Sequence, residues 1–372
     1  MLDKPIPIAK PHFAGETQDA ILRDMKGVFQ SGRLLDGPFA EKLESFWASE
    51  TRRAYAVAID TCTTALTVVC LYFGVKGKDV LVPAASFITD ATAVLNAGGN
   101  PVLVDVDPET LSFDLQDLQR KTGPNTAGII WVHLTGMIAR NHAEIVGHCR
   151  RNGLFIIEDA AHAHGAELGG RPAGSFGDVA CFSFYATKVV TSGTGGIAVT
   201  DDPKLARFLK QYRSFGKDPE SGLVTAVSGD HHLDEIRCCV AYHQSGDMKR
   251  QVAARRDIAR RYEDGLRNQP HIHLIDPGPD GQPSYYQFPI MVDSRENATR
   301  LSAALAAKHG IQAKKIYLPL HEEVVFRHMD TGSLKQAEDA MHRSLCLPVW
   351  VGLSQQDIER VIAAVTAEVQ TL

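Results

Sequence analysis

One lysine of this chain lies in a tract of hydroxyls, small residues and glycines. Lys188 stands in the stretch FSFYATKVVTSGTGG (182–196), between Thr187 and a pair of valines. A lysine between apolar neighbours is either a surface charge on a strand edge or a buried amine that is kept for chemistry. Lysine is seldom fully buried without a partner. The second interpretation therefore requires a group elsewhere in the chain that can pair with the amine.

A candidate partner follows an apolar run earlier in the chain. Asp159 comes after LFII (154–157) and Glu158, where a buried strand would end. In open α/β sheets, ligands bind at the carboxyl ends of strands, because loops there project polar groups. Alone, Asp159 would more often cap the next helix or pair with an arginine. The combination of Asp159, His162 and Lys188 indicates a site for pyridoxal 5′-phosphate (PLP).

The chemistry of PLP requires these residue types. A lysine holds the cofactor through its aldehyde, and the ring acts as an electron sink when its nitrogen is protonated. A carboxylate beside that nitrogen favours the protonated form by about 4 kcal/mol at a separation of ~4 Å and an effective dielectric constant of ~20. The phosphate needs donors, which a helix N-terminus and hydroxyl groups supply. The segment DTCTTALTVVC (60–70) offers both through Thr63 and Thr64, and Ser183 adds a hydroxyl, although an ordinary helix cap explains the threonines equally well.

The elements that would position these residues alternate along the chain. Helical spacing is followed by apolar runs of strand length, which predicts an α/β fold with a mainly parallel, buried sheet flanked by helices. The predicted strands are 54–59, 79–83, 100–107, 127–136, 154–161, 179–186 and 195–202. The predicted helices are 16–32, 37–51, 65–75, 87–99, 111–123 and 141–153.

The pattern changes after residue 213. Region 214–235 is typical of an exposed loop, and a charged helix is expected over 247–269. Further strands are expected at 285–293 and 311–321, with a closing helix at 354–370. We therefore expect an N-terminal segment and large PLP-binding domain over 1–246 and a small C-terminal α/β domain over 247–372.

One long segment carries a specific resemblance. IEDAAHAHGAELGGRPAGSFGDVACFSFYATK (157–188) closely resembles the core motif of the DegT-type (StrS-type) sugar aminotransferases, which are fold-type I PLP enzymes. Other matching segments follow the same order as in that family, and the resemblance covers nearly the whole chain. They are GRLLDGPFAEKLE (32–44), VPAASFITDATAVLNAGGNPVLVDVDPET (82–110), YLPLH (317–321) and SLCLPVW (344–350).

The resemblance implies roles for individual residues. Lys188 matches the Schiff-base lysine, Asp159 the partner of the pyridine nitrogen, and His162 the residue packed on the ring face. Phe87 matches an aromatic position over the other face of the cofactor, although alone it would more often be a core residue. The implied phosphate contacts are Thr63, Thr64 and Ser183. The positions implied to lie near the substrate are Tyr317 and His321, although a histidine at a strand end is more often structural.

Two segments depart from the family pattern. Thr61, Cys62 and Thr63 stand where relatives commonly have Ser-Gly-Thr. In SGDHHLDE (228–235), Asp230 and His232 stand where relatives carry an Asn and an Arg or Lys, and that Asn reaches the cofactor phosphate of the neighbouring subunit. A carboxylate facing a phosphate is repelled, so we expect this loop to serve the acceptor substrate instead. A solvated loop without contacts is an equally open alternative.

The activity implied by the resemblance is transamination in a homodimer with shared active sites. Glu or Gln would donate the amino group, a keto-sugar or keto-cyclitol would accept it, and Lys188 would move the proton. A PLP-dependent epimerase, or another non-transaminating reaction on an amino sugar, would use the same residues. A regulatory protein without turnover is a third possibility, against which the pair of Lys188 and Asp159 argues.

The composition excludes several other classes of protein. A formal net charge of -5 over 372 residues gives no field that would gather nucleic acid or anionic lipid, and the apolar runs are too short or too interrupted to span a bilayer. The seven cysteines are scattered and never spaced as C-x-x-C, so neither a disulfide framework nor a metal site is expected. The proline-rich start lacks the apolar stretch of a signal peptide. We therefore expect a cytoplasmic enzyme without nucleic-acid or membrane partners.

Overall fold

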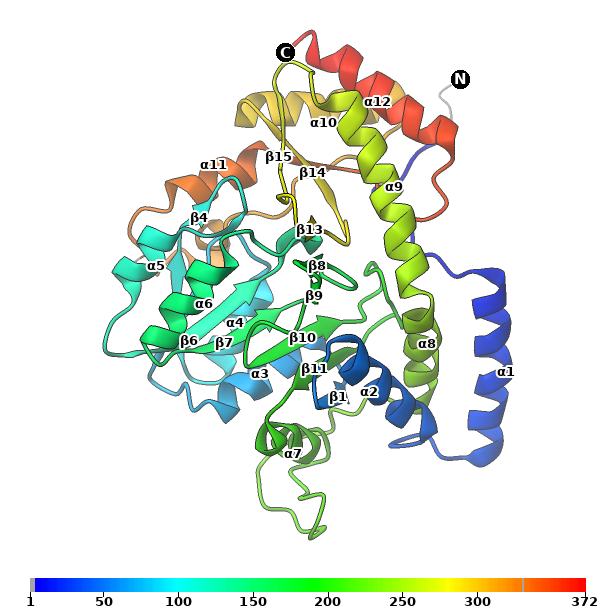
Figure 1. Cartoon of the computed structure of the whole chain (residues 1–372), viewed down its shortest axis with the longest axis vertical. Helices are drawn as coiled ribbons and strands as arrows, with labels where there is room; N and C mark the ends of the chain where they lie inside the picture. The colour runs from blue at the N-terminus through cyan, green and yellow to red at the C-terminus, as the bar shows by residue number, and fades with distance from the viewer. Residues whose placement is uncertain (1–3, 330) are drawn as a thin grey trace.

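The computed structural model describes residues 4–329 and 331–372, and a seven-stranded sheet lies at its centre (Figure 1). The strand order is β1-β11-β10-β7-β6-β2-β3. These strands are β1 (Tyr55–Ile59), β2 (Asp79–Pro83), β3 (Asn100–Val104), β6 (Thr126–Val132), β7 (Phe155–Asp159), β10 (Val179–Ser183) and β11 (Gly196–Thr200). Strand β11 runs antiparallel to β1 and β10, whereas the pairs from β10 to β3 are parallel. The predicted α/β class with a mainly parallel sheet is confirmed.

Helices cover both faces of this sheet because its strands are apolar on both sides. Successive side chains of a strand point to opposite faces. In β1, Val57 and Ile59 enter one core, and Ala56 and Ala58 enter the other. The first core is covered by α3 (Cys62–Tyr72), α4 (Ile88–Asn96) and α7 (Pro203–Arg213). The second is covered by α2 (Pro38–Glu50), α5 (Leu115–Lys121), α6 (His142–Arg151) and α8 (Glu235–Gly246).

The C-terminal part has a smaller sheet of its own. Its strand order is β12-β14-β15, and the long helix α9 leads to it from α8 (Figure 1). Its elements are α9 (Met248–Leu266), β12 (Ile272–Leu274), β14 (Phe288–Val292), α10 (Arg295–His309), α11 (Lys335–Arg343), β15 (Ser344–Leu347) and α12 (Gln355–Val369). The N-terminal segment also packs here, since Ile6 donates its N–H to the carbonyl of Gly310 at 2.9 Å. The predicted domain boundary between residues 246 and 247 stays a proposal.

The remaining elements are short, apart from α1 (Gly15–Ser31) on the outside of the molecule. They are β4 (Val106–Asp107), β5 (Ser112–Phe113), β8 (Glu167–Leu168), β9 (Arg171–Pro172), β13 (Gly281–Gln282), η1 (Leu134–Gly136), η2 (Leu320–Glu322) and η3 (Val324–Phe326). No helix in the described parts of the chain is long and apolar enough to cross a membrane.

One expectation about secondary structure is wrong, and one helix was missed. The segment 311–321 forms no strand: only Ile311 and Lys314 make isolated bridges, to Ile6 and Cys346. Beyond them Pro319 cannot donate to a ladder. The expected charged helix over 247–269 is present as α9, whereas the helix before it, α8, which begins at residue 235, was not predicted. Its signal was the side chain of Asp234, which caps α8 by accepting the N–H of Arg237.

Candidate active site

Lys188 is a buried amine in the turn between β10 and β11. The residue is only 9% exposed, and its backbone N–H donates to the carbonyl of Tyr185 at 2.9 Å. Val189 and Val190, which follow it, are 1% and 0% exposed. The valine pair therefore anchors the turn in the core and holds the lysine inside, so the strand-edge interpretation does not apply.

Burial makes the amine of Lys188 easier to deprotonate than that of an exposed lysine. Burial lowers the pKa of Lys188 to about 8, although Asp159, Cys62 and Asp90 act in the opposite direction. The Nζ atom lies 4.3 Å from the centre of the Tyr286 ring, a contact that favours the ammonium form. A neutral amine is nucleophilic, so a pKa near 8 gives Lys188 reactivity that an exposed lysine lacks near neutral pH.

Asp159 ends strand β7 at the carboxyl edge of the sheet. It lies beside Val132 of β6 and Cys181 of β10, and it is 5% exposed. Its Oδ1 accepts the N–H of Ala161 at 2.9 Å, and its charge acts on Lys188. The structure thus places the predicted carboxylate and the predicted amine in one buried site.

The candidate phosphate site lies at the same edge. Ile59, Gly196 and Ser183 form a row across β1, β11 and β10. A Cβ atom on Gly196 would lie 2.4 Å from the backbone nitrogen of Cys62, so the N-terminus of α3 packs against this row. Ser183 and the N-terminus that carries Thr63 are therefore close together. Such an arrangement of N–H and hydroxyl donors suits a phosphate.

Thr61, rather than Thr63 or Thr64, caps helix α3. Its Oγ1 accepts the N–H of Thr64 at 3.0 Å, and the two hydroxyl oxygens lie 2.8 Å apart. Burial, with Asp159, holds the pKa of the Cys62 thiol well above its usual range, so this thiol stays neutral. A neutral thiol in place of the glycine of relatives therefore adds no negative charge to a phosphate site.

His162 is held as a neutral ring between three partners. Burial and the nearby Lys188 hold its pKa well below the usual range. Its Nδ1 accepts the N–H of Thr135 at 3.1 Å, so the ring proton lies on Nε2, which is 3.1 Å from the hydroxyl of Tyr317. The ring centre is 4.3 Å from that of Tyr286. This packing gives the histidine one orientation in the site.

The other predicted residues lie around this centre or apart from it. Phe87 precedes α4 and is 44% exposed, with its ring centre 5.1 Å from that of Tyr317. The Nε2 of His321 is instead 3.0 Å from a carboxylate oxygen of Glu338 in α11. Phe87 and Tyr317 are thus brought together, whereas His321 is held by another helix.

Asp230 and His232 pair with each other in this chain. The His232 Nδ1 is 2.6 Å from Asp230 Oδ1, and its Nε2 is 3.2 Å from Asp36 Oδ2. The neighbouring His231 contacts Asp60, just before α3, at 3.0 Å. Within the described residues, neither Asp230 nor His232 forms a hydrogen bond with Lys188. Their predicted role therefore needs a second subunit or a rearrangement.

Two residues of the site escape prediction from the sequence. Tyr286 comes from the C-terminal part, and its hydroxyl lies 2.8 Å from that of Thr187, beside the lysine. No local pattern indicates this contact. Asp90 is completely buried in α4 and acts electrostatically on Lys188. An acid in the apolar helix TDATAVL was a signal for it.

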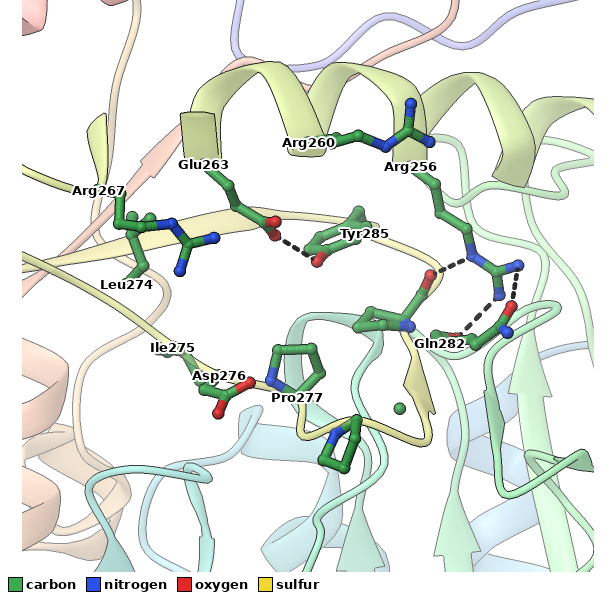
Figure 2. A pocket seen from close by; sticks show the side chains of 13 residues that line it. Arg256, Arg260, Glu263, Arg267, Leu274, Ile275, Asp276, Pro277, Gln282 and Tyr285 are labelled. Atoms are coloured by element: carbon green, nitrogen blue, oxygen red, sulfur yellow. Dashed lines mark hydrogen bonds between the residues drawn. The ribbon is translucent and has the colours of Figure 1, made fainter. Parts of the chain in front are cut away.

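A separate cavity of about 470 Å³ lies between α9 and residues 274–285 (Figure 2). Arg256 donates there to the carbonyls of Pro283 and Gln282 at 2.8 and 2.9 Å. Glu263 accepts the hydroxyl of Tyr285 at 2.8 Å. These groups satisfy one another and hold the segment that leads to Tyr286.

Comparisons with known proteins agree with the geometry around Lys188. Residues 16–366 match the DegT/DnrJ/EryC1/StrS aminotransferase family. GDP-perosamine synthase from Caulobacter vibrioides is 32% identical over 375 residues, covering 98% of each chain. The aminotransferase TlmJ from Streptoalloteichus hindustanus has a TM-score of 0.91 at 29% identity, covering 99% of this chain and 100% of its own.

A second solved structure, in its PLP form, has the same fold. The PLP form of Spr1654 from Streptococcus pneumoniae has a TM-score of 0.92 at 22% identity and covers 99% of both chains. Members of this family depend on PLP. The chain belongs to the DegT/DnrJ/EryC1/StrS aminotransferase family, as its motifs predicted.

Proposed function

We propose that this aminotransferase moves the amino group of Glu or Gln to a keto-sugar or keto-cyclitol. The observation that carries the proposal is the buried amine of Lys188, held beside the carboxylate of Asp159 at the carboxyl edge of the sheet. A sugar acceptor is further supported by the relative GDP-perosamine synthase, whose name includes a nucleotide-linked sugar.

The residues of this edge fit PLP. A buried amine suits its aldehyde, a carboxylate suits its ring nitrogen, and the N-terminus of α3 with Thr63, Thr64 and Ser183 suits its phosphate. When bound, PLP supplies an electron sink for the charge that develops at the α-carbon of the amino donor.

Lys188 and Asp159 divide the proton chemistry between them. A pKa of about 8 leaves roughly a tenth of the Lys188 amine neutral at pH 7, so Nζ can take a proton from the α-carbon of the donor and return it. Asp159 accepts the N–H of Ala161 at Oδ1, and its carboxylate would hold a proton at the ring nitrogen of PLP.

Aromatic side chains orient the reactants around these two groups. The neutral ring of His162 would pack on one face of the cofactor, and Phe87 would cover the other. Burial holds the pKa of the Tyr317 phenol well above its usual range, so this hydroxyl stays protonated and can donate to a sugar oxygen. His321 would contact substrate only if its bond to Glu338 opens.

The proposed enzyme is a homodimer with active sites built across the interface. The segment after α7 projects from the body of the subunit (Figure 1) and exposes apolar side chains that a partner could cover. They are Phe215, Leu223, Val224 and Val227, which are 53%, 65%, 69% and 99% exposed. Asp230 and His232 would then serve the acceptor bound to the partner subunit.

Subunit complementation tests this arrangement. Homodimers of Lys188→Ala and of His232→Ala should each be impaired, the second only toward the acceptor. Mixed dimers should regain one complete site, since Lys188 comes from one chain and His232 from the other. Absence of recovery in verified mixed dimers would show that both residues act within one subunit.

Spectra of the donor half-reaction test the proposed activity. Glu or Gln should convert the visible absorption of the bound cofactor to that of its amine form, and a keto-sugar should reverse the change. The Lys188→Ala variant is the matched control and should not respond at a comparable rate. Failure of every amino acid in a donor panel would refute transamination.

The proposed location is a reducing compartment such as the cytoplasm. All seven cysteines are free thiols and all are buried. Reduced, buried thiols are typical of proteins that are not stabilised by disulfides.

A further inference from the structure

Asp90 is an acid placed where an ionised carboxylate would be very costly. It lies in α4 and is 0% exposed, between Ser86 and the buried Ala91 and Val94. Its Oδ2 accepts a hydrogen bond from the hydroxyl of Ser86. Its Oδ1 is buried and accepts none within the described residues. Transfer of an unpaired carboxylate into such surroundings is strongly unfavourable.

The side chain of Asp90 lies close to that of Asp159. The two side chains are within hydrogen-bonding contact, and the charge of Asp159 raises the cost of ionising Asp90. Burial first, and then the charge of Asp159, hold the pKa of Asp90 well above its usual range, while Ser86 and Lys188 oppose this only in part. The ionisable groups that face Asp90 are Asp159, Lys188, Cys62, Cys70, Cys181 and Tyr317.

The environments of the two acids differ. Asp159 accepts the N–H of Ala161 at 2.9 Å and is the strongest charge partner of Lys188. Asp90 has one hydroxyl donor and an unpaired oxygen. A negative charge is therefore better placed on Asp159, and the shared proton on Asp90.

We propose that Asp90 is the protonated member of a buried carboxyl pair and donates a hydrogen bond from its Oδ1 to Asp159. It is a positioning residue, since it acts on the cofactor only through Asp159, and this consequence rests on the role proposed for Asp159. Together, Ala161 and Asp90 hold the Asp159 carboxylate from two sides. This hydrogen bond favours the ionised form of Asp159 and fixes its orientation toward the ring nitrogen.

Infrared spectroscopy of the full-length holoenzyme tests the protonation state directly. At neutral pH the wild type should show the C=O stretching band of a protonated carboxyl group in a buried setting. The band should disappear in Asp90→Asn and shift in Asp159→Asn. A matched control is Asp117→Asn, which removes another buried acid, in α5. Arg120 and Lys121 help to hold the pKa of Asp117 below its usual range, so it is ionised at neutral pH and this variant should keep the band. A band that is absent in the wild type, or that survives in Asp90→Asn, would overturn the proposal.

Cofactor affinity distinguishes positioning from packing. An amide at position 90 can still donate to Asp159, so Asp90→Asn should bind PLP within about 3-fold of the wild type, whereas Asp90→Ala should bind at least about 10-fold more weakly. Equal losses in both variants would refute the positioning role. If Asp90→Ala does not fold, the infrared comparison of the wild type with Asp90→Asn still decides. The infrared band requires no turnover, so an inactive enzyme that shows the band would contradict the proposed activity and not the pair.

The pH dependence of stability has a defined sign. A carboxyl group whose pKa is raised by folding stabilises the protein below its ordinary pKa of about 4, and this contribution is lost as the pH rises. Asn cannot ionise, so the melting temperature of Asp90→Asn should gain on the wild type from about pH 4 upward. A constant difference from pH 4 to 8 would contradict a proton on Asp90.

Discussion

Two regions of this molecule place basic side chains near carboxylates, and they use them differently. In the cavity beneath α9, Arg256 donates hydrogen bonds to backbone carbonyls, and Glu263 accepts one from the hydroxyl of Tyr285 (Figure 2). In the centre around Lys188, the amine lies over the ring of Tyr286, and the charge of Asp159 acts on it. In the first region the polar groups form hydrogen bonds with one another, whereas the second keeps ionisable side chains in a buried place.

The difference identifies which polar region is kept for a ligand. Burying a polar group without a partner costs free energy, so a protein retains such groups mainly where a ligand or a reaction uses them. Lys188, which is buried and whose pKa is lowered to about 8, meets this description.

The largest expected effect is that of Lys188→Ala. The variant should fold but lose covalent PLP, and turnover should fall by at least about 10⁴-fold, because it removes both the anchor and the base. Mass spectrometry after borohydride reduction of the wild type should find the cofactor on a peptide that contains Lys188. Cofactor attached to Lys210 or Lys217 would end the assignment and, with it, the contrast between the two regions.

Asp159→Asn should give the next largest effect. An amide cannot stabilise a positive charge on the ring nitrogen, so the variant should bind PLP but turn over at least about 100-fold more slowly, equivalent to ~3 kcal/mol of barrier. Single-turnover kinetics with an amino donor measure this. A rate near that of the wild type would mean that Asp159 only caps the turn at Ala161.

Tyr286 sharpens the comparison through the charge of the lysine. Tyr286→Leu removes the aromatic face that favours the ammonium, worth about 0.5–2 kcal/mol, and should lower the pKa of Lys188 by roughly 0.4–1.5 pH units below its value of about 8. Tyr286→Phe keeps the face and should leave this pKa unchanged. Competitive chemical labelling of cofactor-free protein across pH gives the pKa. An identical pKa of Lys188 in the wild type and both variants would show that the ring contact does not stabilise the ammonium.

The two regions also differ in how far the sequence predicts them. Lys188, Asp159 and the sheet follow from local patterns, because a strand-end acid and a lysine in a glycine-rich turn are adjacent to the elements that place them. Tyr286 is nearly a hundred residues from Lys188 along the chain, and only tertiary packing brings its ring to the amine. The segment 311–321 misled the strand prediction since its apolar residues serve the core without a ladder.

The smallest expected effect on catalysis comes from the cavity beneath α9. Arg256→Met should cost about 1–3 kcal/mol of stability, because the carbonyls of Pro283 and Gln282 lose their donor in a partly buried setting. Arg260 instead pairs with Asp257 on the surface, so Arg260→Met should change stability by less than about 0.5 kcal/mol.

Thermal melts and PLP titrations of both variants show whether the cavity beneath α9 only supports the structure or binds a ligand. A purely structural role for Arg256 would affect the cofactor site little, because Tyr286 is also held by the hydroxyl of Thr187 and its carbonyl lies near Arg255. PLP affinity should therefore stay within about 3-fold of the wild type in both variants, and only Arg256→Met should melt earlier. If Arg260→Met abolished turnover without a change in melting, the cavity would be a substrate site. Its arginines would then be reserved for an anion, and the two regions would no longer contrast.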